Sequence, residues 1–593
     1  MYVKRVTVHR GDKHYAYLRL VEAFRDQAGK VQHRILATLG REDLLKASGQ
    51  LDQLAGIFAR LDPPRIGTRR EVGPLLLVKS VIERLDLVRL VDKHVPQRGR
   101  AELTTGEVIA ALVANRLCAP APLYDVAAWG AAAALHEALG IPGMLLNDDR
   151  LGRALEAFAP VAEAVRGAVA LQAIEAFGVD AARLHLDLTT LRFAGAYERS
   201  ALVGKGWGSD RRVARQVRAL QAVTPAGIPL YVRPHPGSSA ELTCIGEALG
   251  RLAGLLGRGL LVCADSAMGH VKNLCAADRA GLRFIVPLRA DTGFAERFLA
   301  EAGHEALMPL RYVSQRDRRL PPRRRPRYRG TIRPWTVKNP ETKQDRTFRV
   351  VYVWSSEEAQ SVADARERAL VKAEEQLAQL RRAIARTNKS ASEVASRVAT
   401  ITIPAVKPLL TVSIEARGRA KPKLHWQRNS ALIAQLARTD GVYALATNLE
   451  GRITATRVLK TYKQQNLVEQ RHRDAKQTLR VRPIFLHNDD RIEGLIGVVG
   501  LALTVFGLIE AEARNALGPE HKLAAILPER RAARPTGRSI LAAFQGFGLT
   551  YTASGPRLDP PTPTQQRILT LLRAPVPWPT REAQALASCG KRG

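Results

Sequence analysis

Cysteine and acidic residues are the two scarce classes in this sequence. Its 593 residues include 5 cysteines, and no two of them form a Cys-x2-Cys pair, which argues against a zinc finger and a disulfide scaffold. Aspartate and glutamate number 56 against 91 lysines and arginines, so the formal net charge is +35. A deficit of acids this large predicts a polyanionic partner such as nucleic acid. Charge alone does not separate an enzyme that cuts nucleic acid from a protein that packages it.

The sequence also lacks clear membrane and export signals. The stretch Gly494 to Ile509 is 16 residues without a charge, whereas a transmembrane helix needs about 20 apolar residues. This stretch therefore predicts a buried helix rather than a membrane span. No basic and apolar leader opens the chain, because residues 1–20 alternate polar and apolar side chains. We expect a cytoplasmic protein in a reducing compartment, without a membrane partner.

Hydrophobic periodicity divides the rest of the chain into regions. Three alternating runs, around residues 3–8, 15–21 and 31–39, predict a small antiparallel sheet. From about residue 70 to 178 the pattern is helical, and a capping box at Thr104–Glu107 is expected to begin one helix. From about residue 516 the chain mixes arginine with proline, which predicts a loosely folded tail.

Two aspartates follow apolar segments that have the pattern of strands. Residues 184–188 alternate leucine with polar side chains before a Thr-Thr pair, so this strand is expected to end near Asp187. Residues 260–264 are a continuous apolar run, typical of a fully buried strand, and Asp265 follows at once. An acid just past a buried strand points into a crevice at the sheet edge. His185 shares the strand parity of Asp187 and is either a core or a supporting residue.

A third acid lies in a segment with helical spacing, residues 461–479. At about 100° per residue, Tyr462, Gln465, Glu469 and Lys476 share a stripe roughly 60° wide on one continuous helix. An apolar seam that could pack on a sheet runs beside this stripe. Glu469 is therefore predicted to point across the sheet edge toward the two aspartates.

Three carboxylates at one edge suggest a metal site. Without cations they would repel one another by a few kcal/mol at an effective dielectric of about 20. Two divalent ions about 4 Å apart, held by hard carboxylate oxygens, are what phosphodiester cleavage needs. We expect Asp187, Asp265 and Glu469 to be catalytic and to bind two Mg²⁺ or Mn²⁺ ions, with Lys476 on a DNA phosphate. The alternative is that each acid is an ordinary strand-end cap or one more charge on a solvated helix.

Two further acidic pairs have a simpler explanation. Asp148–Asp149 and Asp489–Asp490 each follow an asparagine and precede a helical pattern. This position favours helix capping over metal binding.

The acids Asp265 and Glu469 are separated by more chain than one loop of a compact domain accommodates. An insertion is therefore expected after a strand at 284–288, returning near Gly441. It contains nine arginines between Arg316 and Arg333 and a long helix from Glu357 to Thr387. Arginines interleaved with tyrosine and tryptophan suit phosphate binding with some base stacking, and the triplet Arg323, Arg324 and Arg325 is the candidate contact. The alternative is a solvated loop.

The acids and the spacing Tyr-x2-Gln-x3-Glu-x6-Lys resemble the DDE transposases of bacterial insertion sequences that carry a Tyr-Arg-Glu-Lys signature. Gln465 stands where these transposases have arginine, which removes a fixed cation from the signature. The resemblance continues through residues 227–237, 281–290 and 440–448 and covers roughly 180–515. The opening segment also looks like the amino-terminal part of a long-chain branch of these transposases.

The resemblance implies an RNase H-like α/β core with a mixed sheet and flanking helices, interrupted by the insertion and preceded by a β-rich segment and a helical region. It implies cleavage of double-stranded DNA at the terminal inverted repeats of an insertion sequence, and strand transfer into target DNA. The protein would act as a homodimer on paired ends, in the bacterial cytoplasm near the nucleoid. A DNA hairpin intermediate would need a flipped base stacked on an aromatic ring, for which Trp335 or Trp354 is a candidate.

These patterns give an expected division of the chain, in which the helical region is either a DNA-end-binding region or a brace for the core. The expected parts are a β-rich segment at 1–62, the helical region at 63–178, the first part of the core at 179–290, the insertion at 291–440, the second part of the core with the Glu469 helix at 441–515, and a C-terminal tail at 516–593. Two other functions stay open, an architectural DNA-binding protein without catalysis and a related metal-dependent nuclease or domesticated recombinase.

Overall fold

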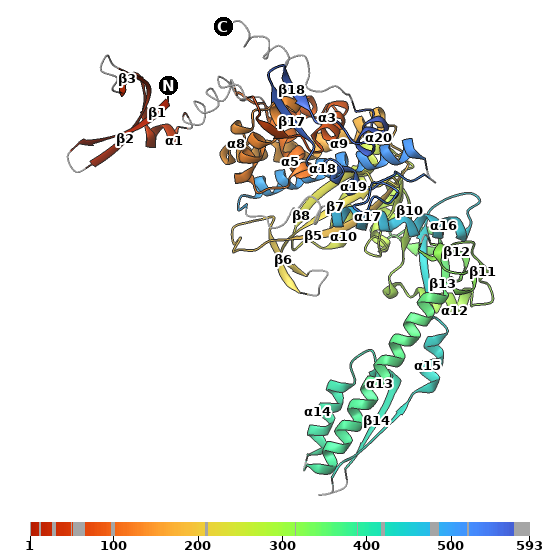
Figure 1. The fold of residues 1–593 in the computed structure, drawn as a ribbon. Coiled ribbons are helices and arrows are strands. Elements are labelled where there is room, and N and C mark those ends of the chain that lie inside the picture. The colour runs from red at the N-terminus through yellow and green to blue at the C-terminus, as the bar shows by residue number, and fades with distance from the viewer. Residues whose placement is uncertain are drawn as a thin grey trace. The chain divides into compact units, whose positions relative to one another are not determined.

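A computed structural model gives the structure of the protein. It describes residues 2–10, 13–25, 31–48, 50, 66–96, 101–207, 212–314, 316–387, 389–416, 421–474, 486–518 and 521–574. The fold is mixed α/β, as the sequence predicts, and the chain divides into two compact units (Figure 1). Unit 1 is Met1–Asp180, Thr189–Ser238 and Gln470–Gly593, and unit 2 is Ala181–Leu188 and Ser239–Glu469. The boundaries between the units fall inside strand β5 (Arg183–Arg192) and helix α17 (Asn466–Arg473), so both units contain part of each element.

Unit 1 begins with a separate antiparallel sheet. The three alternating runs of the sequence form β1 (Tyr2–Arg10), β2 (Lys13–Arg25) and β3 (Val31–Arg41), with β2 in the middle. The helix α1 (Glu42–Ala47) follows and begins with two acidic residues, which suit the positive end of the helix dipole.

The rest of unit 1 is mostly helical. Its helices before the shared strand are α3 (Leu75–Arg84), α4 (Leu87–His94), α5 (Thr105–Cys118), α6 (Val126–Ala132), α7 (Leu135–Leu139), α8 (Asp148–Phe158) and α9 (Ala162–Phe177). The predicted capping box is confirmed, because Thr104 accepts from the Glu107 N–H at 3.1 Å and Glu107 accepts from the Thr104 N–H at 2.7 Å.

The core of unit 1 surrounds helix α18 (Asp489–Leu517). This helix contacts α3, α5, α8, α9 and strand β8 (Pro229–Pro236), and its residues from Gly494 to Ala511 are all buried. The prediction of a buried helix is thus confirmed. Asp489–Leu517 and the broken stretch Asp148–Phe177 are each long and apolar enough to cross a membrane, but 94% of the most apolar window of α18 is buried inside the protein.

The acidic pairs lie in the first turns of α8 and α18, but they are not the caps. The preceding asparagines, Asn147 and Asn488, accept from the N–H groups of Arg150 and Arg491. Asp489 instead accepts from the Ala201 N–H at 2.8 Å and the Leu202 N–H at 3.2 Å, so it fixes a loop.

The expectation of a loosely folded tail is wrong for the described residues 521–574. They form α19 (Gly537–Ala542), β17 (Gly548–Thr552), β18 (Gly555–Leu558) and α20 (Pro563–Leu571). Strand β17 pairs with β4 (Arg69–Glu71), almost five hundred residues earlier in the chain. Because this pairing is non-local, the proline and arginine content of the segment gave no sign of it.

A run of strands crosses unit 2 in the order β11-β12-β13-β16-β10-β9-β5. The sheet is mixed, since β9 and β10 run parallel to β5 while β16 runs antiparallel to β10. The strands are β5 (Arg183–Arg192, shared with unit 1 from Thr189), β9 (Leu261–Cys263), β10 (Arg283–Pro287), β11 (Met308–Pro309), β12 (Tyr328–Lys338), β13 (Asp345–Ser355) and β16 (Val442–Thr447). In unit 1, β7 (Val213–Val223) pairs with β6 (Gly204–Trp207) and with β8.

Helices α10 (Glu241–Leu256), α11 (Val271–Arg279), α12 (Phe294–Glu301) and α16 (Ala455–Tyr462) accompany this sheet. The apolar side of α16 packs on one sheet face, where Val458 and Leu459 join a buried cluster with Cys263, Ile285 and Leu445. This packing determines which side of α16 faces the strands.

A second core of unit 2 lies in an arm, residues 356–437. It consists of α13 (Ser356–Arg386), α14 (Ala391–Ile401), β14 (Leu410–Glu415), β15 (Lys423–Arg428) and α15 (Ser430–Ala437). The predicted long helix is confirmed as α13, and Figure 1 shows α14 and β14 alongside it. Leucines at 370, 377 and 380 form the buried stripe of α13 and pack with α14 and the hairpin.

Candidate active site

Asp187 lies on β5, and Asp265 lies two residues past the end of the neighbouring parallel strand β9. The register of β5 and β9 places Leu184 opposite Val262 and His185 opposite Cys263. Asp187 is two residues beyond His185, and Asp265 is two residues beyond Cys263, so the same offset brings the two acids opposite each other. Neighbouring strands are about 4.8 Å apart, and side chains two residues apart share one face. The pairing of β5 and β9 therefore brings the two predicted aspartates near each other, and the charge of Asp187 acts on Asp265.

The position of Asp187 differs from the prediction in one respect. Strand β5 does not end near Asp187 but continues to Arg192, because the Thr-Thr pair is β-branched and favours the extended conformation. The neighbouring strand β9 is the one that ends here, at Cys263. Asp265 then turns its carboxylate toward its own chain and accepts from the Ala267 N–H at 3.0 Å.

The carboxylates interact electrostatically. The pKa of the Asp265 carboxyl is raised to about 6, first by burial and second by the negative charge of Asp187. Two carboxylates about 5 Å apart repel by roughly 3 kcal/mol at an effective dielectric of about 20. This pair therefore favours the binding of a cation or a proton.

Below the acids, the same face carries His185 and Cys263, and both are fully buried. Burial lowers the pKa of His185 to about 4, with a contribution from Arg183, and raises the pKa of the Cys263 thiol to about 12. Both groups are therefore neutral at pH 7 and form a layer under the aspartates.

Tyr462 and Glu469 approach the strands from the helical side. Tyr462, at the end of α16, packs against the cluster that contains Cys263. Burial raises the pKa of the Tyr462 hydroxyl to about 12, and the negative charges of Asp265 and Glu469 raise it as well. Tyr462 thus interacts electrostatically with both Asp265 and Glu469. Glu469 itself is exposed.

The prediction of one continuous helix from Tyr462 onward is wrong. Helix α16 ends at Tyr462, a 3-10 turn spans Lys463–Gln465, and α17 (Asn466–Arg473) follows. Three residues per turn replace 3.6 in this segment, so the angles computed for a single helix do not apply. The side chain of Gln465 and all of Lys476 lie outside the described residues.

The described residues contain no group of three or more His, Cys, Asp or Glu side chains arranged to hold a metal ion together. The donors nevertheless suit a divalent cation: two carboxylates share one sheet face, their charges repel, and hard oxygens are the ligands that Mg²⁺ and Mn²⁺ prefer. The negative charge of the third acid, Glu469, raises the pKa of Tyr462, as the charge of Asp265 does.

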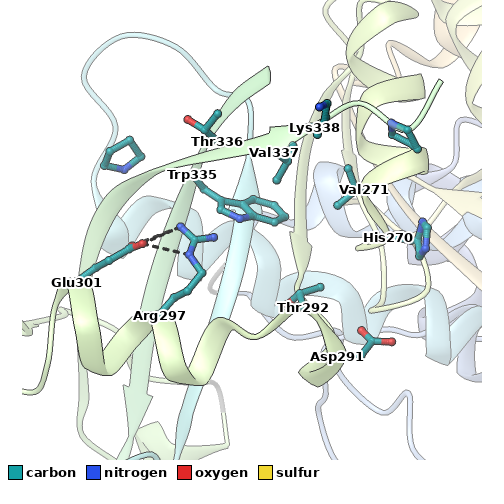
Figure 2. A pocket seen from close by; sticks show the side chains of 12 residues that line it. His270, Val271, Asp291, Thr292, Arg297, Glu301, Trp335, Thr336, Val337 and Lys338 are labelled. Carbon is teal, nitrogen blue, oxygen red and sulfur yellow. Dashed lines mark hydrogen bonds and ion pairs between the residues drawn. The ribbon is translucent and has the colours of Figure 1, made fainter. Parts of the chain in front are cut away.

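Cavities in unit 2 lie beside the acids rather than around them. One of about 530 Å³ is lined by Tyr462, Lys463, Tyr443 and Pro287, and the β9–β10 register puts Pro287 at the level of Asp265. Another, of about 940 Å³, is lined by Trp335 and by Arg297, which pairs with Glu301 at 3.1 Å (Figure 2). None of the three predicted acids lines this larger cavity.

The arginine-rich run from 316 to 333 contains two 3-10 turns and the first part of β12. Arg323 and Arg324 are exposed in a 3-10 turn, whereas Arg325 folds back and donates to the carbonyls of Leu320 at 2.9 Å and Arg318 at 3.1 Å. The run ends in β12, where Trp335 is only 4% exposed. Trp335 is therefore not a free stacking ring, and Trp354 is half-buried against His304.

Sequence reasoning missed a buried charge network in unit 1, which we call the Arg471 network. Arg471 on α17 is 2% exposed; it donates to the Gly227 carbonyl and to Asp474 at 2.9 Å and pairs with Glu510 at 3.2 Å. Glu510 also pairs with Arg514 and accepts from the Gly537 N–H at 2.8 Å. The spacing of Arg471 and Asp474 could have indicated a pair within one helix, but the partners on α18 and in the turn before β8 could not be read from it.

Comparisons with known proteins agree with this geometry. A family model described as "Transposase DDE domain" matches residues 182–505, and one described as "IS1634 family transposase, N-terminal domain" matches residues 3–57. A third, a domain of unknown function named DUF4277, matches residues 68–164. No curated protein matches the chain. The first match spans more than half of the sequence and contains both strand acids and Glu469.

Proposed function

Because the chain belongs to the DDE transposases and its function is therefore DNA transposition, we propose that Asp187, Asp265 and Glu469 are its catalytic carboxylates. One observation supports this assignment: Asp187 and Asp265 each lie two residues beyond the paired residues His185 and Cys263, and the pKa of Asp265 is raised by burial and by the charge of Asp187. In a purely architectural DNA-binding protein this like-charged pair would have no purpose.

Two divalent ions, Mg²⁺ or Mn²⁺, are the cofactor we propose for these residues. When bound, they would activate the attacking oxygen and neutralise the leaving oxygen of a phosphodiester. Asp187 would supply an oxygen from β5 and Asp265 one from the segment just after β9, while Glu469 would supply one from a helix that begins only after a 3-10 turn. His185 and Cys263, buried and neutral at pH 7, would add no charge to the site.

The remaining residues of the signature would hold DNA. Tyr462 lines the smaller cavity and interacts electrostatically with Asp265 and Glu469, and its hydroxyl, protonated at pH 7, would donate to a phosphate oxygen. Lys476 would hold a phosphate next to the scissile one, and Gln465 would bind by hydrogen bonds where related transposases have arginine. Arg323 and Arg324 offer exposed cations, and Arg325 shapes the turn that presents them.

We propose the following reaction. Water attacks a phosphodiester at the end of the insertion sequence, which exposes a 3′ hydroxyl, and that hydroxyl attacks target DNA in line. The protein would act as a homodimer on paired terminal inverted repeats. Residues 63–178 would recognise the ends and residues 291–440 would be an insertion in an RNase H-like core, as in the transposases with the Tyr-Arg-Glu-Lys signature.

The test is Mg²⁺-dependent nicking of end DNA by three variants, Asp187→Asn, Asp265→Asn and Glu469→Gln. We expect each to lose nicking while binding to end DNA stays nearly unchanged, because affinity comes from lysines and arginines. Asp149→Asn is the matched control, since Asp149 is an exposed acid in the first turn of α8, and it should nick normally. Wild-type nicking by any of the three variants would remove that residue from the site.

A further inference from the structure

The hairpin of β6 and β7 carries an exposed tryptophan. Its antiparallel register places Lys205 opposite Arg215 and Trp207 opposite Val213. Because side chains alternate along a strand, these four residues share one face. Trp207 is 62% exposed and Val213 is 61% exposed. The outer face of the hairpin therefore presents a large aromatic ring to solvent beside an exposed valine.

The opposite face of the hairpin fixes this orientation. It is made of glycines that pack flush on the Gly237 turn: a Cβ atom on Gly206 would lie 2.3 Å from the Gly237 carbonyl oxygen, and one on Gly237 would lie 1.9 Å from the Gln216 carbonyl oxygen. Gln216 is buried and its Nε2 donates to the Gly237 carbonyl at 3.1 Å. No side chain larger than hydrogen fits at Gly206, and by strand alternation the neighbouring Trp207 points to the opposite, outer face.

Both strands of the hairpin carry a basic residue on the same face as the indole. The described residues of the hairpin, 204–207 and 212–216, include Lys205, Arg212 and Arg215 and no acidic residue. Arg215 donates to the Tyr197 carbonyl at 3.3 Å, which orients its guanidinium group. Lys205 and Arg212 are exposed.

We propose that this hairpin face binds a DNA strand, with the Trp207 indole stacked on a nucleobase and Lys205 and Arg215 on the flanking phosphates. An aromatic ring between cations is the arrangement that single strands bind, because every base has a π-face and every linkage has a charge. Bases inside an intact duplex have both faces covered by their neighbours. The ring therefore takes an unpaired base at a DNA end or flap. This inference rests on DNA as the partner, as proposed above.

Two DNA probes test the proposal with the full-length protein in EDTA, which prevents cleavage: a fully paired duplex of end sequence, and the same duplex with a single-stranded 3′ overhang containing 2-aminopurine. We expect Trp207→Ala to lose roughly 5-fold to 100-fold in affinity for the overhang probe and to keep its affinity for the paired duplex. It should also abolish the quenching of 2-aminopurine fluorescence. Trp207→Phe keeps a π-face and should recover most of the affinity.

Further variants separate stacking from charge. Lys205→Ala should lower the slope of log affinity against log salt by about 0.7 on the overhang probe. Tyr124→Ala removes another aromatic side chain, 68% exposed, and should behave as the wild type on both probes. An unchanged affinity of Trp207→Ala for the overhang, or an equal loss on both probes, would overturn the proposal. If the wild-type protein failed to bind the paired duplex, the proposed function would fail instead.

Discussion

Two groups of charged side chains in this protein follow opposite rules. In the Arg471 network of unit 1, buried carboxylates and guanidinium groups neutralise one another, and Arg471 pairs with both Asp474 and Glu510. In unit 2, Asp187 and Asp265 place two negative charges side by side, and the pKa of Asp265 is raised. The first group is complete without a ligand, while the second has an excess of negative charge. The contrast separates charges that hold the fold from charges that are arranged for a cation.

The largest expected effect removes the centre of the neutralised group. Arg471→Met leaves Asp474 and Glu510 buried without their main cation, and breaking a buried pair in this way costs about 3–5 kcal/mol. Urea unfolding followed by tryptophan fluorescence measures the loss. Arg473→Met is the matched control, because Arg473 is exposed on the same helix, and it should change stability by less than about 0.5 kcal/mol. Equal effects of the two variants would mean that the network does not stabilise unit 1.

The second prediction concerns the like-charged pair in the absence of metal. The folded-state pKa of Asp265 is about 6, above the ordinary value of 3.8, so the folded protein binds more protons than the unfolded chain between these values. Stability contributed by this group is therefore present below about pH 4 and is lost as pH rises through 6. Asp265→Asn should stabilise the protein by about 1–3 kcal/mol at pH 7.5.

Thermal unfolding of Asp265→Asn and of the wild type, in EDTA at pH 4 and pH 7.5, gives the measurement. The difference in stability should be present at pH 7.5 and absent at pH 4. Asp149→Asn should show no such dependence, because Asp149 is exposed. A destabilised Asp265→Asn at pH 7.5 would place Asp265 among the charges that hold the fold.

The third prediction asks how much of this effect comes from the partner acid. Burial is the largest cause of the raised pKa of Asp265, and the charge of Asp187 is the second. Asp187→Asn should therefore lower the pKa of Asp265 but leave it above the ordinary value. The measurement is the change in stability caused by Asp265→Asn as a function of pH, made once in the wild-type background and once in the Asp187→Asn background. The pH at which this change appears should be lower in the Asp187→Asn background. The same pH in both backgrounds would show that the two carboxylates do not interact.

The smallest expected effect tests charges that belong to neither group. Arg323 and Arg324 are exposed, so replacing both by alanine should reduce the slope of log affinity against log salt by up to about 1.8, without changing sequence preference. Arg325→Ala should reduce DNA binding indirectly, because its guanidinium holds the turn through the carbonyls of Leu320 and Arg318. Titrations of end DNA at several salt concentrations measure both. An unchanged slope for the double variant would show that these arginines remain solvated.

Local features of the fold could be predicted where they depend on neighbours in sequence. The capping box at Thr104, the long helix α13 and the buried helix α18 follow from spacing and apolar content, and the structure confirms all three. The two strand acids could be chosen because each follows an apolar run. That the two acids lie near each other could not be predicted, because it depends on the parallel pairing of β5 and β9.

Predictions failed where the chain makes a local change that periodicity does not record. The 3-10 turn at Lys463–Gln465 breaks the helix between Tyr462 and Glu469, so a single angular scale misplaced the residues on it. Strand β5 continues past Asp187 because β-branched threonines extend it. The sequence also did not predict that Trp335 is buried and Trp207 exposed, because each tryptophan has basic residues near it in the sequence.

The sequence by itself determined the kind of chemistry: an excess of cations for DNA and three carboxylates in the order of a transposase, because charge and residue order are properties of the chain alone. Only the tertiary structure decided which charges face which. Parallel pairing put Asp187 beside Asp265 and raised a pKa, while packing of α17 and α18 joined Arg471 to Glu510, 39 residues away. The physical reason is that electrostatic interaction depends on distance and burial, and both are set by non-local packing.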